Sequence, residues 1–147
     1  MTGAEGQTPL PYEAIDHTAD LAYIARGATQ AELFQHAAEG LTAFLLDPKL
    51  IACRDCDLVE VTGADLEECL VNWLNELIYR EEVLLRVYAR FEVEFTGLSS
   101  LRAVCSGEEL DRGRHTLLTD LKAATYHDLR ITSDGQGGYE ARIVLDI

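Results

Sequence analysis

Both stretches of helical periodicity in the 147-residue chain end by about Glu82, and strand patterns dominate the remaining residues. Apolar residues three and four apart predict one helix over about Thr29–Leu46 and a second from Asp65 to about Glu82. A Thr-x-x-Glu capping box at Thr29 marks the start of the first helix. The expected strands are short segments bounded by turn residues: Tyr12–Ile15, Leu21–Gly27, Asp57–Thr62, Tyr88–Phe95, Leu101–Ser106, Leu121–Tyr126, Leu129–Thr132 and Tyr139–Asp146, with a polar stretch over Gly107–Thr116.

Segregated helices followed by a run of strands favour an α+β domain, with a mainly antiparallel β-sheet and two α-helices packed on one face. The composition agrees, because 48% hydrophobic and 26% charged residues are ordinary values for a folded domain. The sequence shows no internal repeat and no linker. We therefore expect a polar N-terminal tail over residues 1–10 and a single domain over residues 11–147.

The chain is strongly acidic, with 12 Lys and Arg residues against 26 Asp and Glu residues and a net charge of −14. Nucleic acids and anionic membranes attract clustered basic side chains, whereas the basic residues here are scattered from Arg26 to Arg142. We therefore expect direct binding to neither. No segment approaches the roughly 18 apolar residues of a membrane span, and residues 1–10 do not resemble a signal peptide. The expected location is cytoplasmic, with reduced cysteines.

The acidic residues are concentrated in one region. Between Asp55 and Glu82, nine Asp and Glu residues accompany one base, Arg80. This pattern is typical of a solvated helix face. It also fits a docking surface for a basic protein.

Polar side chains gather between the first two predicted strands, in the segment Asp16-His17-Thr18-Ala19-Asp20. Asp16 and Asp20 could supply oxygen ligands to a hard cation, with His17 orienting one of them. The alternative is a hydrogen-bonded turn, in which Asp and Thr side chains satisfy nearby backbone donors. Spacing alone favours the turn.

The C-terminus places two carboxylates next to each other. The apolar strand Ile143-Val144-Leu145 runs directly into Asp146 and Ile147, so the α-carboxylate of Ile147 lies one residue from the Asp146 side chain. Neighbouring fixed anions repel each other unless protonation, solvent or a cation offsets the repulsion. If Asp20 lay nearby, three carboxylates would converge and would suit Ca²⁺ or Mg²⁺. The alternative is a solvated, frayed chain end.

The histidines outside this segment show weaker patterns. Lys122 and His127 lie close in sequence and could form an acid–base pair. A surface strand with an extended lysine accounts for them more simply. His36 and His115 are single histidines for which the sequence shows no partner.

The Cys53-x-x-Cys56 pair invites a zinc or a redox interpretation. A zinc site would need two further ligands, and neither a second Cys pair nor a nearby His pair supplies them. A redox motif would normally begin a helix, whereas this pair precedes a predicted strand. We therefore expect no function for it. The phosphate-binding, dinucleotide-binding, nucleophile-elbow and zinc-protease motifs are also absent.

Seven segments occur together in this order: Asp16-His17-Thr18-Ala19-Asp20, Glu32-Leu33-Phe34, Leu70–Tyr79, Gly107-Glu108, Arg114-His115, Lys122-Ala123-Ala124-Thr125-Tyr126-His127 and Val144-Leu145-Asp146-Ile147. In this combination the chain resembles the archease family from Tyr12 onward. The first segment, the Lys-Ala-x-Thr-Tyr-His segment and the penultimate Asp carry the resemblance together. The Cys53-x-x-Cys56 pair and the N-terminal extension to Leu10 depart from the family pattern.

The resemblance implies an α+β fold and a non-catalytic accessory role. Archeases activate the RtcB-type tRNA-splicing RNA ligase by promoting guanylylation of the ligase and its repeated turnover. The family metal site implies Asp20, Asp146 and the terminal residue Ile147 as ligands. Ca²⁺ is the expected divalent cation, with Mg²⁺ or Mn²⁺ as alternatives. The expected partner is therefore an RtcB-type RNA ligase, and the resemblance assigns no role to Lys122 or His127.

Two other functions stay open on the residues themselves. A small metal-dependent phosphoester hydrolase could use Asp20 and Asp146 around a metal, with His17 or His127 as the base. A chaperone-like binding module could use its helices to shield another protein. Phosphoester turnover by the protein alone would favour the hydrolase, and activity on unrelated unfolded proteins would favour the chaperone.

Overall fold

The computed structural model describes residues 10–15, 20–133 and 135–147, and its strands form two antiparallel sheets. The first sheet has five strands in the order β1-β2-β8-β6, with β7 also paired to β8, and the second has three in the order β3-β5-β4. The elements are β1 (Tyr12–Ile15), β2 (Leu21–Gly27), α1 (Gln30–Leu45), a short 3-10 helix η1 (Pro48–Leu50), β3 (Asp55–Thr62), α2 (Leu66–Glu82), β4 (Arg86–Gly97), β5 (Ser100–Glu109), β6 (Ala123–Thr125), β7 (Ile131–Ser133) and β8 (Tyr139–Asp146).

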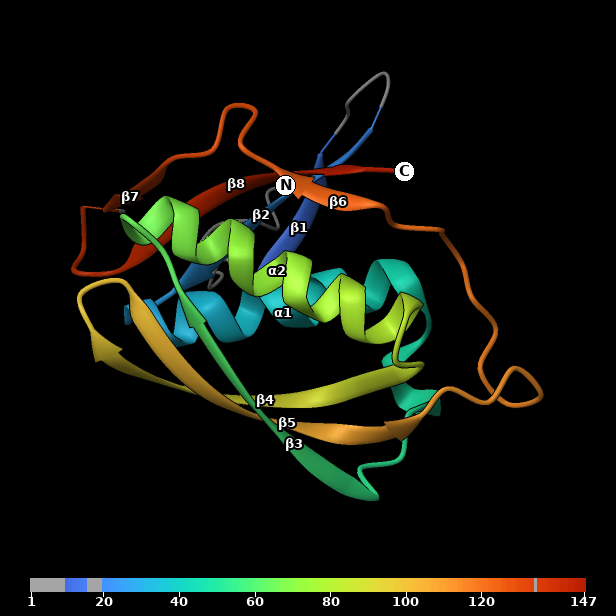
Figure 1. Cartoon of the computed structure of the whole chain (residues 1–147). Helices are drawn as coiled ribbons and strands as arrows, with labels where there is room; N and C mark the ends of the chain where they lie inside the picture. The colour runs from blue at the N-terminus through green and yellow to red at the C-terminus, as the bar shows by residue number, and fades with distance from the viewer. Residues whose placement is uncertain (1–9, 16–19, 134) are drawn as a thin grey trace.

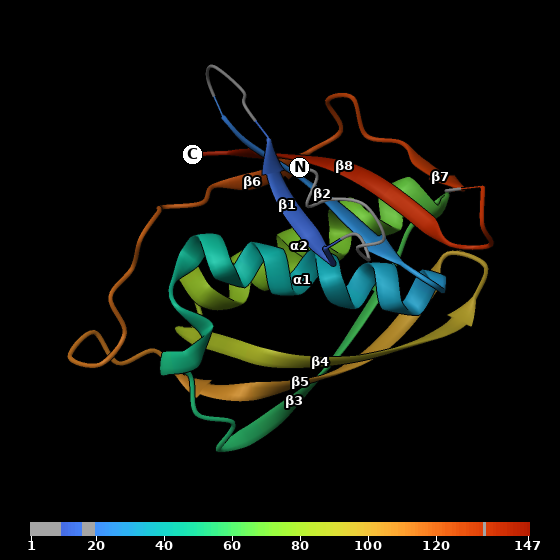
Figure 2. The same ribbon diagram turned by 180° about the vertical axis from the view of Figure 1, so that it is seen from behind.

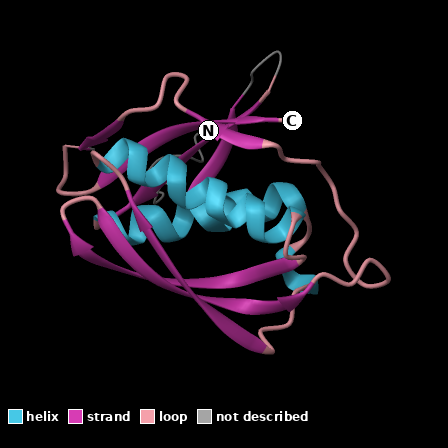
Figure 3. Ribbon diagram, in the orientation of Figure 1, coloured by secondary structure: helices cyan, strands magenta, loops and turns pink. Residues whose placement is uncertain are grey.

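The two long helices form a layer between the two sheets. Figure 1 and Figure 2 show this arrangement from opposite sides, and Figure 3 shows it by secondary structure. The α+β class with antiparallel strands and two helices is confirmed, but the strands make two sheets where a single sheet was expected. The reason is that the helices are apolar on more than one side: α1 contacts both β2 and β4, and α2 contacts β3, β4 and β6. Such helices need cover on both sides.

Each long helix begins with the same reciprocal cap. The Thr29 hydroxyl accepts a hydrogen bond from the Glu32 N–H at 3.1 Å, and the Glu32 carboxylate accepts one at 2.8 Å from the N–H four residues before it. Asp65 and Glu68 repeat this pattern at the start of α2, at 2.8 and 2.7 Å. The predicted cap residues Thr29 and Glu32 are therefore confirmed, with the difference that the Glu32 carboxylate accepts from Ala28, one residue before the cap residue. No helix in the described part of the chain is long and apolar enough to cross a membrane.

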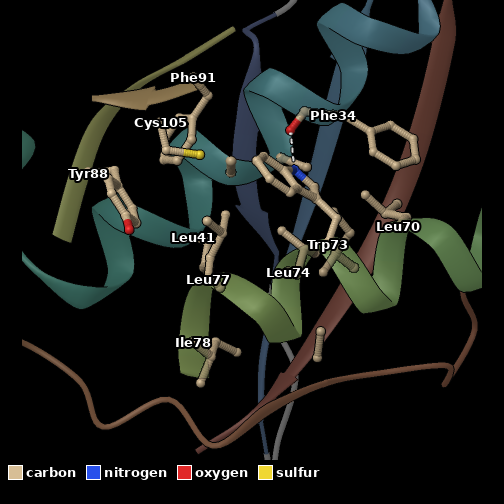
Figure 4. Close-up of a cluster of buried hydrophobic side chains, with 14 of the residues drawn as sticks. Phe34, Leu41, Leu70, Trp73, Leu74, Leu77, Ile78, Tyr88, Phe91 and Cys105 are labelled. Atoms are coloured by element: carbon tan, nitrogen blue, oxygen red, sulfur yellow. Dashed lines mark hydrogen bonds between the residues drawn. The ribbon is translucent and has the colours of Figure 1, made fainter. Parts of the chain in front are cut away.

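Buried hydrogen bonds join the helix layer to its surroundings. Figure 4 shows the indole of Trp73 near Phe34, and its Nε1 donates to the Phe34 carbonyl oxygen at 3.0 Å. The same indole packs edge-on against Phe91 of β4, with ring centroids 6.0 Å apart. The Tyr23 hydroxyl of β2 donates to the Ala37 carbonyl of α1 at 2.7 Å. These bonds satisfy polar atoms that burial would otherwise leave unpaired, so they fix α1 relative to α2 and to the five-stranded sheet.

Strand β5 is longer than the sequence pattern predicts, because it continues past Ser106 to Glu109. Gly107 lies against Val87 and Tyr88 of β4, where a Cβ atom would overlap the Val87 carbonyl. A glycine therefore permits the close approach of β4 and β5 at this point. As a result Glu108 belongs to a paired strand, although its polar neighbours in sequence are typical of a loop.

Candidate functional site

The start of β2 and the end of β8 bring Asp20 and Asp146 to the same end of the five-stranded sheet. Asp20 immediately precedes β2, and Asp146 is the last residue of β8. The two strands are antiparallel, with Leu21 opposite Leu145. Continuing this register by one residue puts Asp20 opposite Asp146. Ile147 follows directly, so the chain ends at this edge of the molecule (Figure 1).

Asp20 and Asp146 belong to the sheet face that points away from the helices. Successive side chains of a strand point to opposite faces. Leu145 and Tyr23 lie in the core, and the Tyr23 hydroxyl bonds to α1, so these two side chains face the helices. Asp146 therefore projects to the other face, as Asp20 would in the same register, and Asp146 is exposed. The fully buried Leu145 anchors the strand just before the carboxylates.

Strand β6 holds the backbone of Asp146 from its other side. Ala123 is opposite Asp146 in the register of β6 and β8, and the Lys122 N–H donates to the Asp146 carbonyl oxygen at 2.9 Å. The end of β8 thus has hydrogen-bonded neighbours on both sides, and the exposed Ile147 extends one residue beyond them. Ile147 therefore follows directly on a strand that is paired on both sides.

The donors at this strand end suit a hard cation. The Asp146 side chain makes no hydrogen bond or ion pair with any residue that the structure describes. Two aspartates and the terminal carboxylate of Ile147 offer oxygen atoms only, the donor set that Ca²⁺ and Mg²⁺ prefer. Among the described residues no group of three or more His, Cys, Asp and Glu side chains could hold a metal ion. Among the described residues, the α-carboxylate of Ile147 is the further oxygen donor beside the two aspartates.

The structure adds no further residue to this carboxylate group from those singled out in the sequence. Asp16 and His17 lie outside the described residues, so the structure does not place them. Lys122 and His127 flank β6 at its two ends, and the His127 ring lies 3.3 Å from the Asp128 carboxylate. Within the described ranges no hydrogen bond or ion pair joins Lys122 to His127.

The Cys53 and Cys56 thiols are both free and exposed. The Cys53 Sγ atom lies 3.7 Å from the Ser106 carbonyl oxygen, and Cys56 is part of β3. The described residues provide no third and fourth ligand for a zinc ion beside them.

A second carboxylate site, which the sequence pattern does not reveal, lies at the end of β5. The Glu108 side chain is 3% exposed, although it carries a charge. Its oxygens contact four donors: the Arg114 Nη2 at 2.7 Å, the Ala52 N–H at 2.8 Å, the His115 Nε2 at 2.9 Å and the Arg54 Nε at 3.0 Å. Glu108 therefore joins three separate parts of the chain.

His115 is the buried member of this cluster, at 1% exposure. Its Nδ1 accepts a hydrogen bond from the Asp111 N–H at 2.9 Å, so the ring proton lies on Nε2 and is donated to Glu108. The sequence shows no partner for His115. The only signal was that Gly107-Glu108 and Arg114-His115 both belong to the segments that carry the family resemblance.

The donors keep Glu108 ionised. The hydrogen bond from Arg114 is the main cause that lowers the pKa of Glu108 to about 2, while burial acts in the opposite direction. The Ala52 N–H, His115 and Arg54 lower the pKa further. Because protein groups neutralise the Glu108 charge, this cluster stabilises the position of the segment that follows β5, and we call it the Glu108 clamp.

The fold and the strand-end carboxylates define a class of protein: a small α+β protein with two helices between antiparallel sheets and an acidic site where its C-terminus meets the second strand. The sequence matches the Archease protein family (MTH1598/TM1083) over residues 12–147. The chain belongs to the archease family.

Relatives and a solved structure agree with this assignment. The chain is 36% identical to "Protein archease" of Methanosarcina mazei over 140 residues, which cover 92% of this chain and 95% of that protein. It is 33% identical to "Protein archease" of Thermococcus gammatolerans, covering 92% of this chain and 98% of the relative. The solution structure of Methanobacterium thermoautotrophicum protein 1598 superposes with a TM-score of 0.75 at 27% identity, covering 93% of this chain and 99% of that one.

Proposed function

We propose that this protein is a metal-binding accessory factor that activates an RtcB-type RNA ligase in tRNA splicing or RNA repair. It would promote guanylylation of the ligase and repeated turnover. Membership of the archease family over residues 12–147 is the observation that carries the proposal. The register that brings Asp20 and Asp146 to one strand end supports the metal-binding part.

Asp20, Asp146 and the terminal carboxylate of Ile147 would hold the cation, with Ca²⁺ as the expected ion and Mg²⁺ or Mn²⁺ as alternatives. Bound there, a divalent cation would supply fixed positive charge on a strongly acidic surface. The chain itself would position these ligands. Leu145 anchors the strand in the core, and the Lys122 N–H holds the Asp146 backbone.

The proposal assigns catalysis to the partner and an accessory role to this chain. The His115 and Glu108 pair is buried and already hydrogen-bonded, so it has no contact with solvent through which to serve a substrate. The net charge of −14 disfavours direct RNA binding. RNA chemistry would therefore proceed on the ligase, with both proteins in the cytoplasm.

Guanylylation of an RtcB-type ligase by GTP and Mn²⁺, measured with and without this protein, tests the proposal. The wild-type protein should raise the rate, and Asp20→Ala or Asp146→Ala should remove most of the increase. Glu92→Ala, which removes an exposed carboxylate from β4, is the matched control and should act like the wild type. Full stimulation by both aspartate variants would overturn the metal-centred mechanism. No stimulation by the wild-type protein would overturn the accessory role.

A further inference from the structure

Three consecutive apolar side chains are exposed where α2 ends. Val83, Leu84 and Leu85 are 59%, 46% and 43% exposed, and Leu118 in the segment after β5 is 63% exposed. A short connection between a helix and a strand is normally polar, and a run of exposed apolar residues in it has a cost unless a partner covers it. We call these four residues the apolar ridge.

The backbone of one ridge residue, Leu85, is held in an unfavourable conformation. Leu85 has φ of 57°, in the left-handed region that branched side chains rarely adopt. Its carbonyl oxygen accepts a hydrogen bond from the Leu110 N–H at 2.7 Å, which fixes the turn against the end of β5. Strain of this kind persists where the surrounding structure maintains it, and it is common at binding sites. The ridge is therefore a fixed feature of the surface.

Two hollows flank the ridge. One, of about 690 Å³, is lined by Leu85 and Leu110, by four arginines and by four acidic residues (Asp55, Glu108, Glu109 and Asp111), a formal charge of 4 − 4 = 0. The other, of about 410 Å³, is lined by Leu118 and carries Glu81, Glu82 and Asp120 against Arg112, a formal charge of 1 − 3 = −2. Apolar residues within a charged rim are the usual composition of a protein–protein interface.

The acidic rim is unfavourable when the protein is alone. Glu81 is only 8% exposed, and burial, followed by repulsion from Glu82 and Asp120, raises its pKa. A partner that brought basic side chains to this rim would relieve the repulsion. The surface is therefore complementary to a partner whose binding site is an apolar depression surrounded by Lys and Arg side chains.

The ridge and the strand-end carboxylates are connected by one segment. The segment from Leu110 to Lys122 starts beside Leu85. In its middle, the Leu118 N–H donates a hydrogen bond to the Leu45 carbonyl oxygen of α1 at 2.7 Å. At its end, the Lys122 N–H donates to the Asp146 carbonyl oxygen. Figure 1 and Figure 2 both show this segment running along the side of the molecule on which the C-terminus lies. A protein large enough to cover the ridge could therefore also reach Asp146.

We propose that the apolar ridge is the docking surface for the RNA ligase that this protein serves, seated in an apolar depression of the ligase with basic residues opposite Glu82 and Asp120. This inference rests on the proposed function and extends it, because it separates the surface that binds the ligase from the carboxylates that hold the cation. Docking on the ridge would present the Asp146 end of the sheet to the partner.

Binding of the full-length protein to the RtcB-type ligase encoded in the same genome, measured by surface plasmon resonance, tests the inference. Leu84→Glu and Leu118→Glu should each weaken binding at least roughly tenfold, since buried apolar anchors dominate such interfaces. Leu98→Glu is the matched control, because Leu98 is 97% exposed in the turn between β4 and β5. Its affinity should stay within about twofold of the wild type. Glu82→Lys should weaken binding more at low salt than at high salt.

All variants should retain the wild-type unfolding temperature, because each substituted side chain lies at the surface. The docking surface would be overturned if the folded Leu84→Glu and Leu118→Glu proteins bound the ligase with wild-type affinity. If the wild-type protein still stimulated the ligase normally, the proposed function would stand. A wild-type dimer that Leu84→Glu dissociates without affecting ligase binding would assign the ridge to self-association instead. If the wild-type protein neither bound nor stimulated the ligase, both proposals would fail.

Discussion

Glu108 near the end of β5 and Asp146 at the end of β8 are both strand-end carboxylates, and their surroundings differ. Glu108 is 3% exposed and receives hydrogen bonds from two guanidinium groups, an imidazole and a backbone N–H. Asp146 is exposed, and its side chain has no hydrogen bond or ion pair within the described residues. Its neighbours are the α-carboxylate of Ile147 and, by register, Asp20.

The difference indicates what each site does. A buried charge that its own protein neutralises contributes to folding, and removing it leaves the surrounding cations without a partner. A carboxylate that stays exposed beside other anions costs little to keep in water and can still bind a cation from solution. The contrast assigns Glu108 to stability and supports the proposal that Asp146 binds a cation.

The largest expected effect is stabilisation by Ca²⁺. If Asp146 belongs to a cation site, Ca²⁺ at a hundred times its dissociation constant should raise the free energy of unfolding by about 2.7 kcal/mol. Urea unfolding of the metal-free protein with and without Ca²⁺ would measure this. Asp146→Asn should remove the increase and Glu108→Gln should keep it. An equal increase in Asp146→Asn would break the distinction between the two sites.

Loss of the buried charge should have the next largest effect. Glu108→Gln preserves the shape of the side chain but removes the anion that Arg114, Arg54 and His115 share. We expect the free energy of unfolding to fall by about 2 kcal/mol. Asp146→Asn in metal-free buffer should change it by less than about 0.5 kcal/mol. Similar losses in the two variants, measured by urea denaturation at neutral pH, would argue against the assignment.

Acid should test the role of Glu108 without a change of sequence. The pKa of Glu108 in the folded protein is about 2, below its ordinary value of 4.5. Its contribution to stability is therefore fully present above the ordinary pKa and is lost as the pH falls towards the folded pKa. The shift sets the relevant range at roughly pH 5 to pH 2. As the pH falls through this range, the free energy of unfolding should decrease more in the wild-type protein than in Glu108→Gln. Parallel pH profiles would show that Glu108 has no such role.

The smallest effect should separate the two arginines of the Glu108 clamp. Arg114 lies closer to Glu108 than Arg54 does, at 2.7 Å against 3.0 Å, and its side chain is 43% exposed against 68%. We expect Arg114→Ala to lower the melting temperature more than Arg54→Ala, and both to lower it less than Glu108→Gln. The reverse order of the two arginine variants would shift the anchoring role to Arg54.

Local elements could be predicted from the sequence because their determinants lie within a few residues. The cap residues of both helices precede apolar periodic segments, and the expected bounds of β1, β2 and β8 are those of the structure. The division into two sheets could not be predicted in this way. Alternating side chains identify a strand, but its partner depends on pairing with distant segments and on which helix face needs cover.

The two carboxylate sites show the same limit. Asp20 and Asp146 come together only through the register of β2 with β8, and spacing cannot reveal a contact between opposite ends of the chain. The adjacent C-terminal carboxylates raise the question of a third ligand, and the family resemblance is what selects Asp20 over Asp16. Glu108 and His115 were harder still, because polar residues after a predicted strand are typical of an exposed loop. Their burial depends on a glycine that lets β4 and β5 approach and on arginines from two other segments.

A crystal structure of the protein grown in the presence of Ca²⁺ would test the central assignment most directly. We predict one ion bound to carboxylate oxygens of Asp20, Asp146 and the C-terminal Ile147, at roughly 2.3–2.6 Å, with Glu108 still bonded to its arginines and to His115. The same crystals with Ca²⁺ bound elsewhere, or with no ion between Asp20 and Asp146 at a saturating concentration, would contradict the account.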